Sequence, residues 1–279
     1  MCQIKLICLS IFCFTYTSIT VAQSLSVTDS SNNYFKLKTT IPGNYTYFNA
    51  DMLDNIYLIT AANRLYKLSS KGDSIAVFND VKKYGNPSYL DVSNPLKILV
   101  YYKSFSTVIV LDRLLSLRNS INLRQYSIFN VQSVATAYDN NFWLFDEQNI
   151  KIKKINEQGI VMLESTDLRQ LVQEVPTATN LIDSDNELYL YDENKGFYIF
   201  DYYGTFKNKL PLLHWKNVAI SKKTLYGFSD DKMYTYLLNT LQLKEYKLPG
   251  FIKEYISIKA INGKLYLLKT TGLEIYDIL

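Results

Sequence analysis

Apolar and polar residues alternate over short runs through most of the chain, and this period of two predicts β-strands. Residues 34–41 (YFKLKTTI) are one such run. Many apolar runs follow directly on turn-forming residues: Ile56–Leu58 follows Asp54-Asn55, and Leu265–Leu267 follows Asn262-Gly263. Asn, Asp and Gly tolerate the positive φ angles of tight hairpins. The pattern therefore predicts short antiparallel strands joined by tight turns.

This hairpin pattern repeats about every 42 residues. The central position of each repeat is apolar or aromatic, and a second apolar position follows it after eight to ten residues. The central positions are Tyr57, Leu99, Trp143, Tyr189, Tyr226 and Tyr266. Four-stranded units with a period of 40 to 45 residues are typical of β-propellers, so six repeats predict six blades. A single helical exception is expected at Asp167–Val175, where apolar residues follow helical spacing.

The last repeat lacks a fourth strand, and the run at residues 34–41 precedes the first complete repeat. We expect this N-terminal strand to complete the last blade, which would close the ring and remove a free sheet edge. The predicted fold is therefore all-β: a six-bladed β-propeller formed by residues 23–279 as a single domain.

Residues 1–22 have the features of a signal peptide. Lys5 precedes a short apolar run, and the small residues Thr20 and Ala22 suit a signal peptidase site before Gln23. The alternatives are an N-terminal strand or a membrane anchor. Elsewhere no apolar run is long enough for a transmembrane helix. Cys2, Cys8 and Cys13 all lie in this segment, so the processed chain would contain no disulfide, cysteine–zinc site or cysteine nucleophile.

The predicted location is the periplasm or the periplasmic face of the outer membrane. The chain ends inside its last repeat, at Leu279, without an added sorting domain, so we expect retention in the cell envelope.

Composition excludes several classes of function. The chain has 30 Lys and Arg against 26 Asp and Glu, a net charge of +4 that is too small and mixed for nucleic-acid binding. One histidine excludes sites that need several imidazoles. Phosphate-binding glycine loops and nucleophile elbows are absent from the sequence. No catalytic residue, cofactor or metal ligand is therefore predicted.

Residues 131–159 (VQSVATAYDNNFWLFDEQNIKIKKINEQG) resemble the NHL-type propeller repeat, in the Asp139-Asn140 turn, Asp146, Asn149 and the closing Gly159. The fourth repeat matches more loosely. A second resemblance rests on DVSNPLKILVYYKSF (91–105), NSINL (119–123) and FWLFDEQN (142–149). These segments resemble a family of exported propellers from Bacteroidota. The resemblance implies six blades and an envelope location, and it implies no catalytic residue.

One segment of the second repeat is the candidate interaction surface. A rigid turn lies beside basic and aromatic residues that would present a recognition surface at one rim of the ring. The alternative is a purely structural turn. The candidate residues are Asp91, Ser93, Asn94, Pro95, Lys97, Tyr102, Lys103 and Phe105.

Three other features have both a structural and a functional interpretation. The aromatic central positions are expected to pack blade against blade rather than to bind sugars. His214-Trp215 is expected in a loop between blades, because no nucleophile or orienting carboxylate is evident for the histidine. A set of acidic residues is expected mainly in turns, with calcium binding in the channel as the alternative. This set is Asp139, Asp146, Asp183, Asp185 and Asp192.

Asp73-Ser74-Ile75 matches the short acceptor pattern for O-glycans on exported Bacteroidota proteins, with Ser74 as the acceptor.

The sequence thus predicts a non-catalytic interaction propeller of the cell envelope, with another envelope protein as partner; it does not specify the oligomeric state. The alternatives are a calcium-dependent propeller hydrolase or lyase and a glycan-binding propeller. The first needs three or four acidic or amide side chains converging on the channel. The second needs exposed Trp143 and Tyr189.

Overall fold

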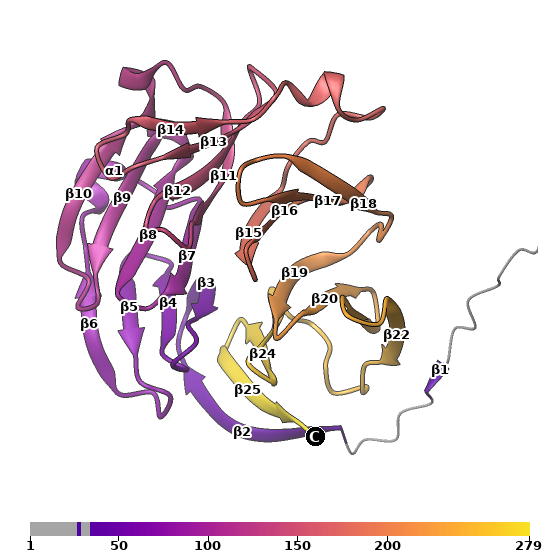
Figure 1. Cartoon of the computed structure of the whole chain (residues 1–279). Coiled ribbons are helices and arrows are strands. Elements are labelled where there is room, and N and C mark those ends of the chain that lie inside the picture. Colours follow the sequence, from indigo (N-terminus) through magenta and orange to yellow (C-terminus); the bar gives the residue numbers. More distant parts are fainter. Residues whose placement is uncertain (1–26, 29–33) are drawn as a thin grey trace, which may run out of the picture.

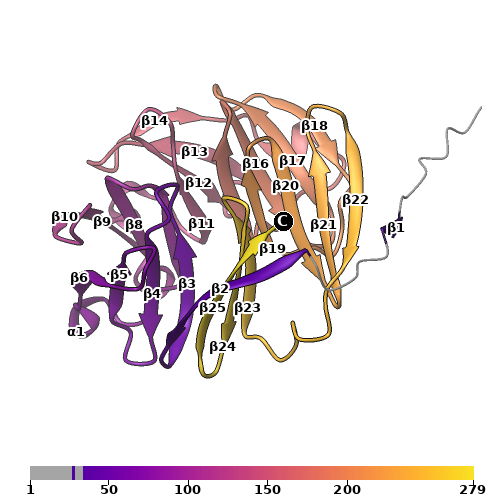
Figure 2. The same cartoon turned by 90° about the horizontal axis from the view of Figure 1, so that it is seen from below.

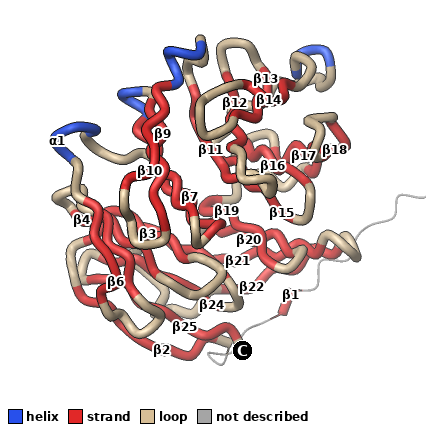
Figure 3. The backbone as a smooth tube through the Cα atoms, turned by 60° about the vertical axis from the view of Figure 1, so that its left-hand side comes forward, coloured by secondary structure: helices blue, strands red, loops and turns tan. Residues whose placement is uncertain are grey.

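The computed structural model describes residues 27–28 and 34–279, so the predicted signal peptide at residues 1–22 lies outside the described residues. Six β-sheets stand in a ring, and the first strand of each blade lies at the centre (Figure 1). Within the described residues, helical structure is confined to α1 (Val81–Tyr84) and three short 3₁₀ turns, η1 (Lys103–Phe105), η2 (Leu123–Tyr126) and η3 (Leu168–Gln170), as Figure 3 shows in blue. The predicted six-bladed β-propeller is confirmed.

Consecutive strands of the chain pair in antiparallel fashion within each blade. Blade 1 contains β3 (Tyr45–Ala50), β4 (Ile56–Thr60), β5 (Leu65–Leu68) and β6 (Ser74–Phe78). Blade 2 contains β7 (Tyr89–Asn94), β8 (Lys97–Tyr102), β9 (Thr107–Asp112) and β10 (Leu117–Asn122). Blade 3 contains β11 (Val131–Thr136), β12 (Phe142–Asp146), β13 (Lys151–Ile155) and β14 (Val161–Glu164).

The remaining blades follow the same plan. Blade 4 contains β15 (Asn180–Ser184), β16 (Glu187–Asp192), β17 (Gly196–Asp201) and β18 (Phe206–Leu210). Blade 5 contains β19 (Lys216–Ser221), β20 (Thr224–Ser229), β21 (Lys232–Leu237) and β22 (Gln242–Lys247), with the two-residue β1 (Val27–Thr28) added in parallel to β22. Blade 6 contains β23 (Ser257–Ile261), β24 (Lys264–Lys269) and β25 (Gly272–Ile278).

The N-terminal strand β2 (Phe35–Pro42) is the fourth strand of blade 6. It pairs antiparallel with β25 from Phe35 opposite Ile278 to Pro42 opposite Gly272. Figure 2 shows β2 lying along β25. The expected clasp is therefore present, and the two ends of the described chain are joined in one sheet.

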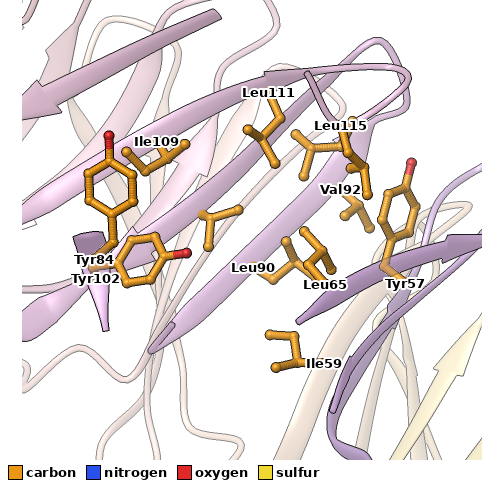
Figure 4. Packing of buried hydrophobic residues seen from close by; sticks show 12 residues of the cluster. Tyr57, Ile59, Leu65, Tyr84, Leu90, Val92, Tyr102, Ile109, Leu111 and Leu115 are labelled. Carbon is orange, nitrogen blue, oxygen red and sulfur yellow. The ribbon is translucent and has the colours of Figure 1, made fainter. Parts of the chain in front are cut away.

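Neighbouring blades are held together by buried side chains. Between blades 1 and 2, Tyr57 and Leu65 from one sheet pack with Leu90 and Ile109 from the next (Figure 4). Of the aromatic central positions, Tyr57, Trp143, Tyr189 and Tyr266 are at most 1% exposed. The expectation of a packing role is correct for these four, and Tyr226 is only partly buried.

The helix expected at Asp167–Val175 is shorter than predicted. Only η3 forms there, with the Asp167 carboxylate accepting a hydrogen bond from the Arg169 backbone N–H. Leu168 is fully buried, whereas Leu171 is 37% exposed. Val172 packs on the core only partly, so the segment beyond η3 has little burial to stabilise a longer helix.

No helix in the described part of the chain has both the length and the apolar character needed to cross a membrane.

Candidate functional site

The ring has two faces, because the antiparallel strands of a blade turn alternately at its two ends. We call one the hairpin face. It carries the turns between the first and second strands and between the third and fourth strands of the blades, including residues 51–55, 95–96, 137–141, 156–160 and 202–205. The opposite crossover face carries the turns between second and third strands and the links between blades.

Large apolar side chains are exposed in the turns of the hairpin face. Eight of them are more than half exposed: Met52, Leu53, Leu96, Leu114, Tyr138, Ile160, Tyr203 and Leu241. Tyr138 and Tyr203 are the most exposed, at 78% and 79%. Exposed apolar side chains gathered on one face are typical of interaction surfaces.

Side-chain contacts join the turn of blade 3 that carries Tyr138 to the turn of blade 4 that carries Tyr203. The Tyr138 ring meets the edge of the Tyr202 ring at 6.1 Å between centroids. The Asp139 backbone N–H donates a hydrogen bond of 2.8 Å to the Tyr202 hydroxyl. The Lys154 ammonium lies 3.1 Å from the Asp139 carboxylate and 3.6 Å from the Tyr202 ring centre. Tyr138 and Tyr203 are therefore displayed by adjoining turns.

Two buried lysines hold further turns of this face, in blades 2 and 3. Lys67 donates to the Arg113 carbonyl of the next blade at 2.9 Å. Lys97 donates to the Asn140 carbonyl and lies 3.5 Å from the Glu157 carboxylate. Burial lowers the pKa of both lysines. These contacts hold the turns that carry Leu96, Leu114, Tyr138 and Ile160.

A central cavity of about 470 Å³ runs between the first strands of the blades. In Figure 1, β3, β7, β11, β15 and β19 lie around the centre of the ring. The edge of each first strand faces this cavity, so its free backbone groups need partners.

Polar side chains of one blade supply these partners for the next. The Asn49 amide donates to the Leu90 carbonyl at 3.0 Å, the Thr136 N–H donates to the Asp91 carboxylate, and the Leu181 N–H donates to the Ser133 hydroxyl at 2.8 Å. Sequence reasoning missed this role. A signal was available: Asn49 and Asp91, like Asn217 and Lys259, are separated by 42 residues, which is the period of the repeat.

Two carboxylates from different blades line the cavity, Asp91 of blade 2 and Asp183 of blade 4. The Trp143 indole N–H donates a hydrogen bond of 2.8 Å to Asp183. Burial raises the pKa of Asp183 to about 6, against the opposing effect of the Trp143 hydrogen bond. The charge of Asp91 adds to the increase.

The structure divides the predicted interaction residues between the two faces. Asn94 and Pro95 lie at the hairpin face, whereas Lys103 and Phe105 lie in η1 at the crossover face. The six residues of β8 separate the two ends, and a strand of that length spans about 20 Å. The expected single patch at one rim is therefore wrong: neighbours in sequence are separated because the strand between them crosses the blade.

Three of the predicted residues are buried. Lys97 is 2% exposed, and Tyr102 is 3% exposed and packs on Tyr84 with 5.4 Å between ring centres. Asp91 faces the cavity and is 8% exposed. Of the set, Ser93, Lys103 and Phe105 are exposed, and Asn94 and Pro95 are partly exposed.

Most of the acidic candidates form ion pairs away from the cavity. Asp146 pairs with Lys153 at 2.8 Å and Asp192 with Lys195 at 3.6 Å. Of the predicted set only Asp183 lines the cavity. Within residues 34–279 and β1, no group of three or more His, Cys, Asp or Glu side chains is placed to hold a metal ion.

The remaining candidates are also located. His214 is exposed in the link before blade 5, while Trp215 is 4% exposed and stacks on Tyr234 with 5.4 Å between centroids. Ser74 is exposed at the start of β6. Trp143 and Tyr189 are buried, so they form no sugar-stacking platform.

No protein-family model matches the chain, and no curated protein is significantly similar to it. Solved structures are similar in fold. The β-propeller domain of Cps50 (Swd1) from Myceliophteria thermophila has a TM-score of 0.61 and 10% identity, over 88% of this chain and all of that domain. A catalytically inactive virginiamycin B lyase from Staphylococcus aureus with quinupristin has a TM-score of 0.58 and 14% identity, over 88% of this chain and 89% of the lyase.

The Pan2 WD40 domain from Neurospora crassa has a TM-score of 0.57 and 11% identity, over 81% of this chain and 73% of that one. At these identities the similarity shows the fold alone.

Proposed function

We propose that this protein is a non-catalytic interaction propeller that binds a protein partner through its hairpin face. The observation that carries the proposal is the set of eight apolar side chains, each more than half exposed, in the turns of that face. A partner that covered them would remove apolar surface from water. Buried lysines already hold the turns of Leu96, Leu114, Tyr138 and Ile160, so binding there requires little reordering.

Tyr138 and Tyr203 are the proposed centre of the interface. Both are almost fully exposed and are carried by turns that contact each other. Tyrosine is enriched among the residues that dominate binding energy, because its large ring loses little conformational entropy on binding. Leu96, Leu114 and Ile160 would extend the apolar contact around blades 2 and 3.

The cell envelope is the proposed location, on the basis of the signal peptide expected at residues 1–22. The partner would then be another envelope protein. Ser74 is exposed at the outer strand of blade 1 and remains the proposed O-glycan acceptor.

The enzymatic alternative has less support from the structure than the interaction surface has. The lyase neighbour is inactive when a histidine is replaced by alanine. In this chain the single histidine, His214, is exposed outside the central cavity. Asp91 and Asp183 bring two carboxylates to the cavity beside the amides of Asn49, Asn180, Asn217 and Asn262. Among the described residues, however, no group of three or more His, Cys, Asp or Glu side chains is placed to hold a calcium ion.

Affinity purification from the native envelope after crosslinking tests the proposal. The tagged wild-type protein, the double variant Tyr138→Ser with Tyr203→Ser, and the control Phe105→Ser are compared. Phe105 is a matched control because it is an exposed aromatic residue on the opposite face. We expect wild type and control to recover the same partner, and the double variant to recover at least tenfold less. Equal recovery by all three proteins, or recovery of no partner, would refute it.

A further inference from the structure

The interface between blades 5 and 6 differs from the interfaces around the rest of the ring. Tyr226 occupies the central aromatic position of blade 5, but it is only partly buried, whereas its counterparts Tyr57, Tyr189 and Tyr266 are at most 1% exposed. A cavity of about 310 Å³ lies here, between the sheet of blade 5 and the β2–β25 clasp. Sheets that pack fully against each other leave no such space, so its presence needs an explanation.

One wall of this cavity is a polar row across three strands. Tyr226 on β20 lies directly opposite Thr235 on β21, and Thr235 lies directly opposite Lys244 on β22. All three line the cavity. Residues paired in this way have Cβ atoms about 5 Å apart on one face of the sheet. A phenol, a hydroxyl and an ammonium group therefore lie side by side.

Two of these groups lack a partner among the residues that the structure describes. Thr235 is 7% exposed, and its hydroxyl has no hydrogen-bond partner in the described part of the chain. Lys244 is partly exposed, and its ammonium group likewise has no carboxylate partner among residues 34–279. A hydroxyl and an ammonium group that both line the cavity, without partners among the described residues, can donate hydrogen bonds to the same anion.

The rest of the cavity is apolar and aromatic. Met233 and Phe35 are 3% and 7% exposed, and Ile278 of β25 completes this side. Tyr34 and Tyr246 stand edge to face at 6.3 Å between ring centres. These groups suit the hydrocarbon part of a ligand, which would be close to the polar row.

We propose that this cavity binds a small carboxylate with an aliphatic or aromatic body. The carboxylate accepts hydrogen bonds from Lys244 and Thr235, and the body fills the space against Met233, Phe35 and Tyr246. A volume of about 310 Å³ holds on the order of ten non-hydrogen atoms. The carboxylate can come from a free organic acid or from the C-terminal residue of a peptide. The site is separate from the hairpin face and does not depend on the proposed partner.

Isothermal titration calorimetry with defined probes tests the site. The free-acid probe is 4-phenylbutyrate and its uncharged match is 4-phenylbutanol. The peptide probes are N-acetyl-glycyl-phenylalanine as the free acid and as the amide. We expect one or both acids to bind and each uncharged match to bind at least tenfold more weakly. The acid that binds more tightly identifies the source. Failure of both acids to bind at millimolar concentration would overturn the proposal.

Three variants separate specific binding from adsorption. Lys244→Met keeps the side-chain length without the charge, and we expect it to weaken acid binding at least tenfold. Thr235→Val keeps the shape without the hydroxyl, and we expect about threefold weakening. Lys216→Met removes a charge from an exposed lysine of the same blade that does not line the cavity, and binding should be unchanged.

Equal acid binding by wild type and Lys244→Met would overturn the proposal. So would acid binding that appears only after residues 1–33 are removed, because the cavity would then be filled by the chain itself. Thermal unfolding of each variant confirms that the fold is retained, and Thr235→Val supplies a second test if Lys244→Met is unstable.

Discussion

The Asp183 side chain in the central cavity forms a structural hydrogen bond and is also partly removed from water. Its carboxylate accepts the Trp143 indole hydrogen bond at 2.8 Å, which holds a fully buried ring in place. The same position removes the carboxylate from water and places it near Asp91, so its pKa rises to about 6. In the unfolded chain this carboxylate is in water and away from Asp91, so it ionises near pH 4. The charged form is therefore disfavoured in the native state.

Asp183→Asn should make stability less dependent on pH. Between about pH 4 and 6 the native state holds more protons than the unfolded chain, so the free energy of unfolding of wild type falls as pH rises. Asp183→Asn has no carboxyl group at this position, so its free energy of unfolding does not fall for this reason. We expect its stability relative to wild type to increase by about 1–2 kcal/mol between pH 4 and pH 7.5, allowing for partial solvent exposure. Urea unfolding at both pH values measures the difference.

The control for this prediction is Asp139→Asn. Burial acts to raise the pKa of Asp139, but the hydrogen bonds from Lys154 and Asn141 outweigh it and lower the pKa, so its pH dependence should have the opposite sign. If the difference in free energy of unfolding between Asp183→Asn and wild type were the same at both pH values, the burial of this carboxylate would be contradicted.

At the scale of elements, the clasp depends on the close approach of two strands. Gly272 begins β25 with a φ of +146° and lies opposite Pro42 of β2. A Cβ atom at this position would lie 2.3 Å from the Ile41 carbonyl oxygen. The oxygen belongs to the backbone, so it cannot move away without displacing the strand. Glycine is therefore required where the N-terminal strand joins the last blade.

Gly272→Ala should weaken the clasp. We expect a loss of about 2–4 kcal/mol in the free energy of unfolding, from the steric conflict together with backbone strain. Gly263→Ala is the control, since Gly263 also has positive φ but no atom within 4 Å of an added Cβ. The control should lose about 1–2 kcal/mol. Equal losses measured by chemical denaturation would show that close approach at Gly272 is unimportant.

The whole molecule is a closed ring whose closure depends on both ends of the described chain. β2 and β25 pair across the largest sequence separation in the fold, and each blade contacts two neighbours through buried clusters. Without β2, the edge of β25 would be open, and open edges pair with other chains. The clasp thus stabilises blade 6 and protects the ring from association.

Truncation separates these contributions. Removal of residues 1–33 leaves β2 intact, and we expect a melting temperature within a few degrees of that of the full chain. Removal of residues 1–42 deletes β2, and we expect loss of the cooperative thermal transition together with aggregation. Differential scanning calorimetry and size-exclusion chromatography measure both effects. A monomeric protein with unchanged melting after removal of residues 1–42 would show that the clasp is not needed for closure.

Local patterns were sufficient for most of the fold. The period of 42 residues, the turn residues and the unpaired run at 34–41 predicted six blades and the clasp, because strand alternation and turn preference are properties of neighbouring residues. The helix expected at 167–175 was overestimated. Its spacing was suitable, but a helix also needs a surface to pack against. Only Leu168 of the four apolar positions is fully buried, Val172 packs on the core partly, and Leu171 is exposed.

The candidate sites depended on distances that a linear pattern does not contain. Asn94 and Phe105 are close in sequence yet lie on opposite faces, because β8 carries the chain across the blade. Tyr138 and Tyr203 are far apart in sequence yet belong to adjoining turns, because Tyr202 contacts both Tyr138 and Asp139. The polar row of Tyr226, Thr235 and Lys244 exists only through strand pairing.

The amino-acid sequence by itself determined the all-β class, the number of blades and the strand that closes the ring, since these follow from short-range alternation repeated along the chain. Only the tertiary structure decided which side chains share a face, which are buried and where the packing between blades leaves a cavity. The physical reason is that a turn reverses the chain every few residues, so exposure depends on the assembled sheets rather than on neighbours in sequence.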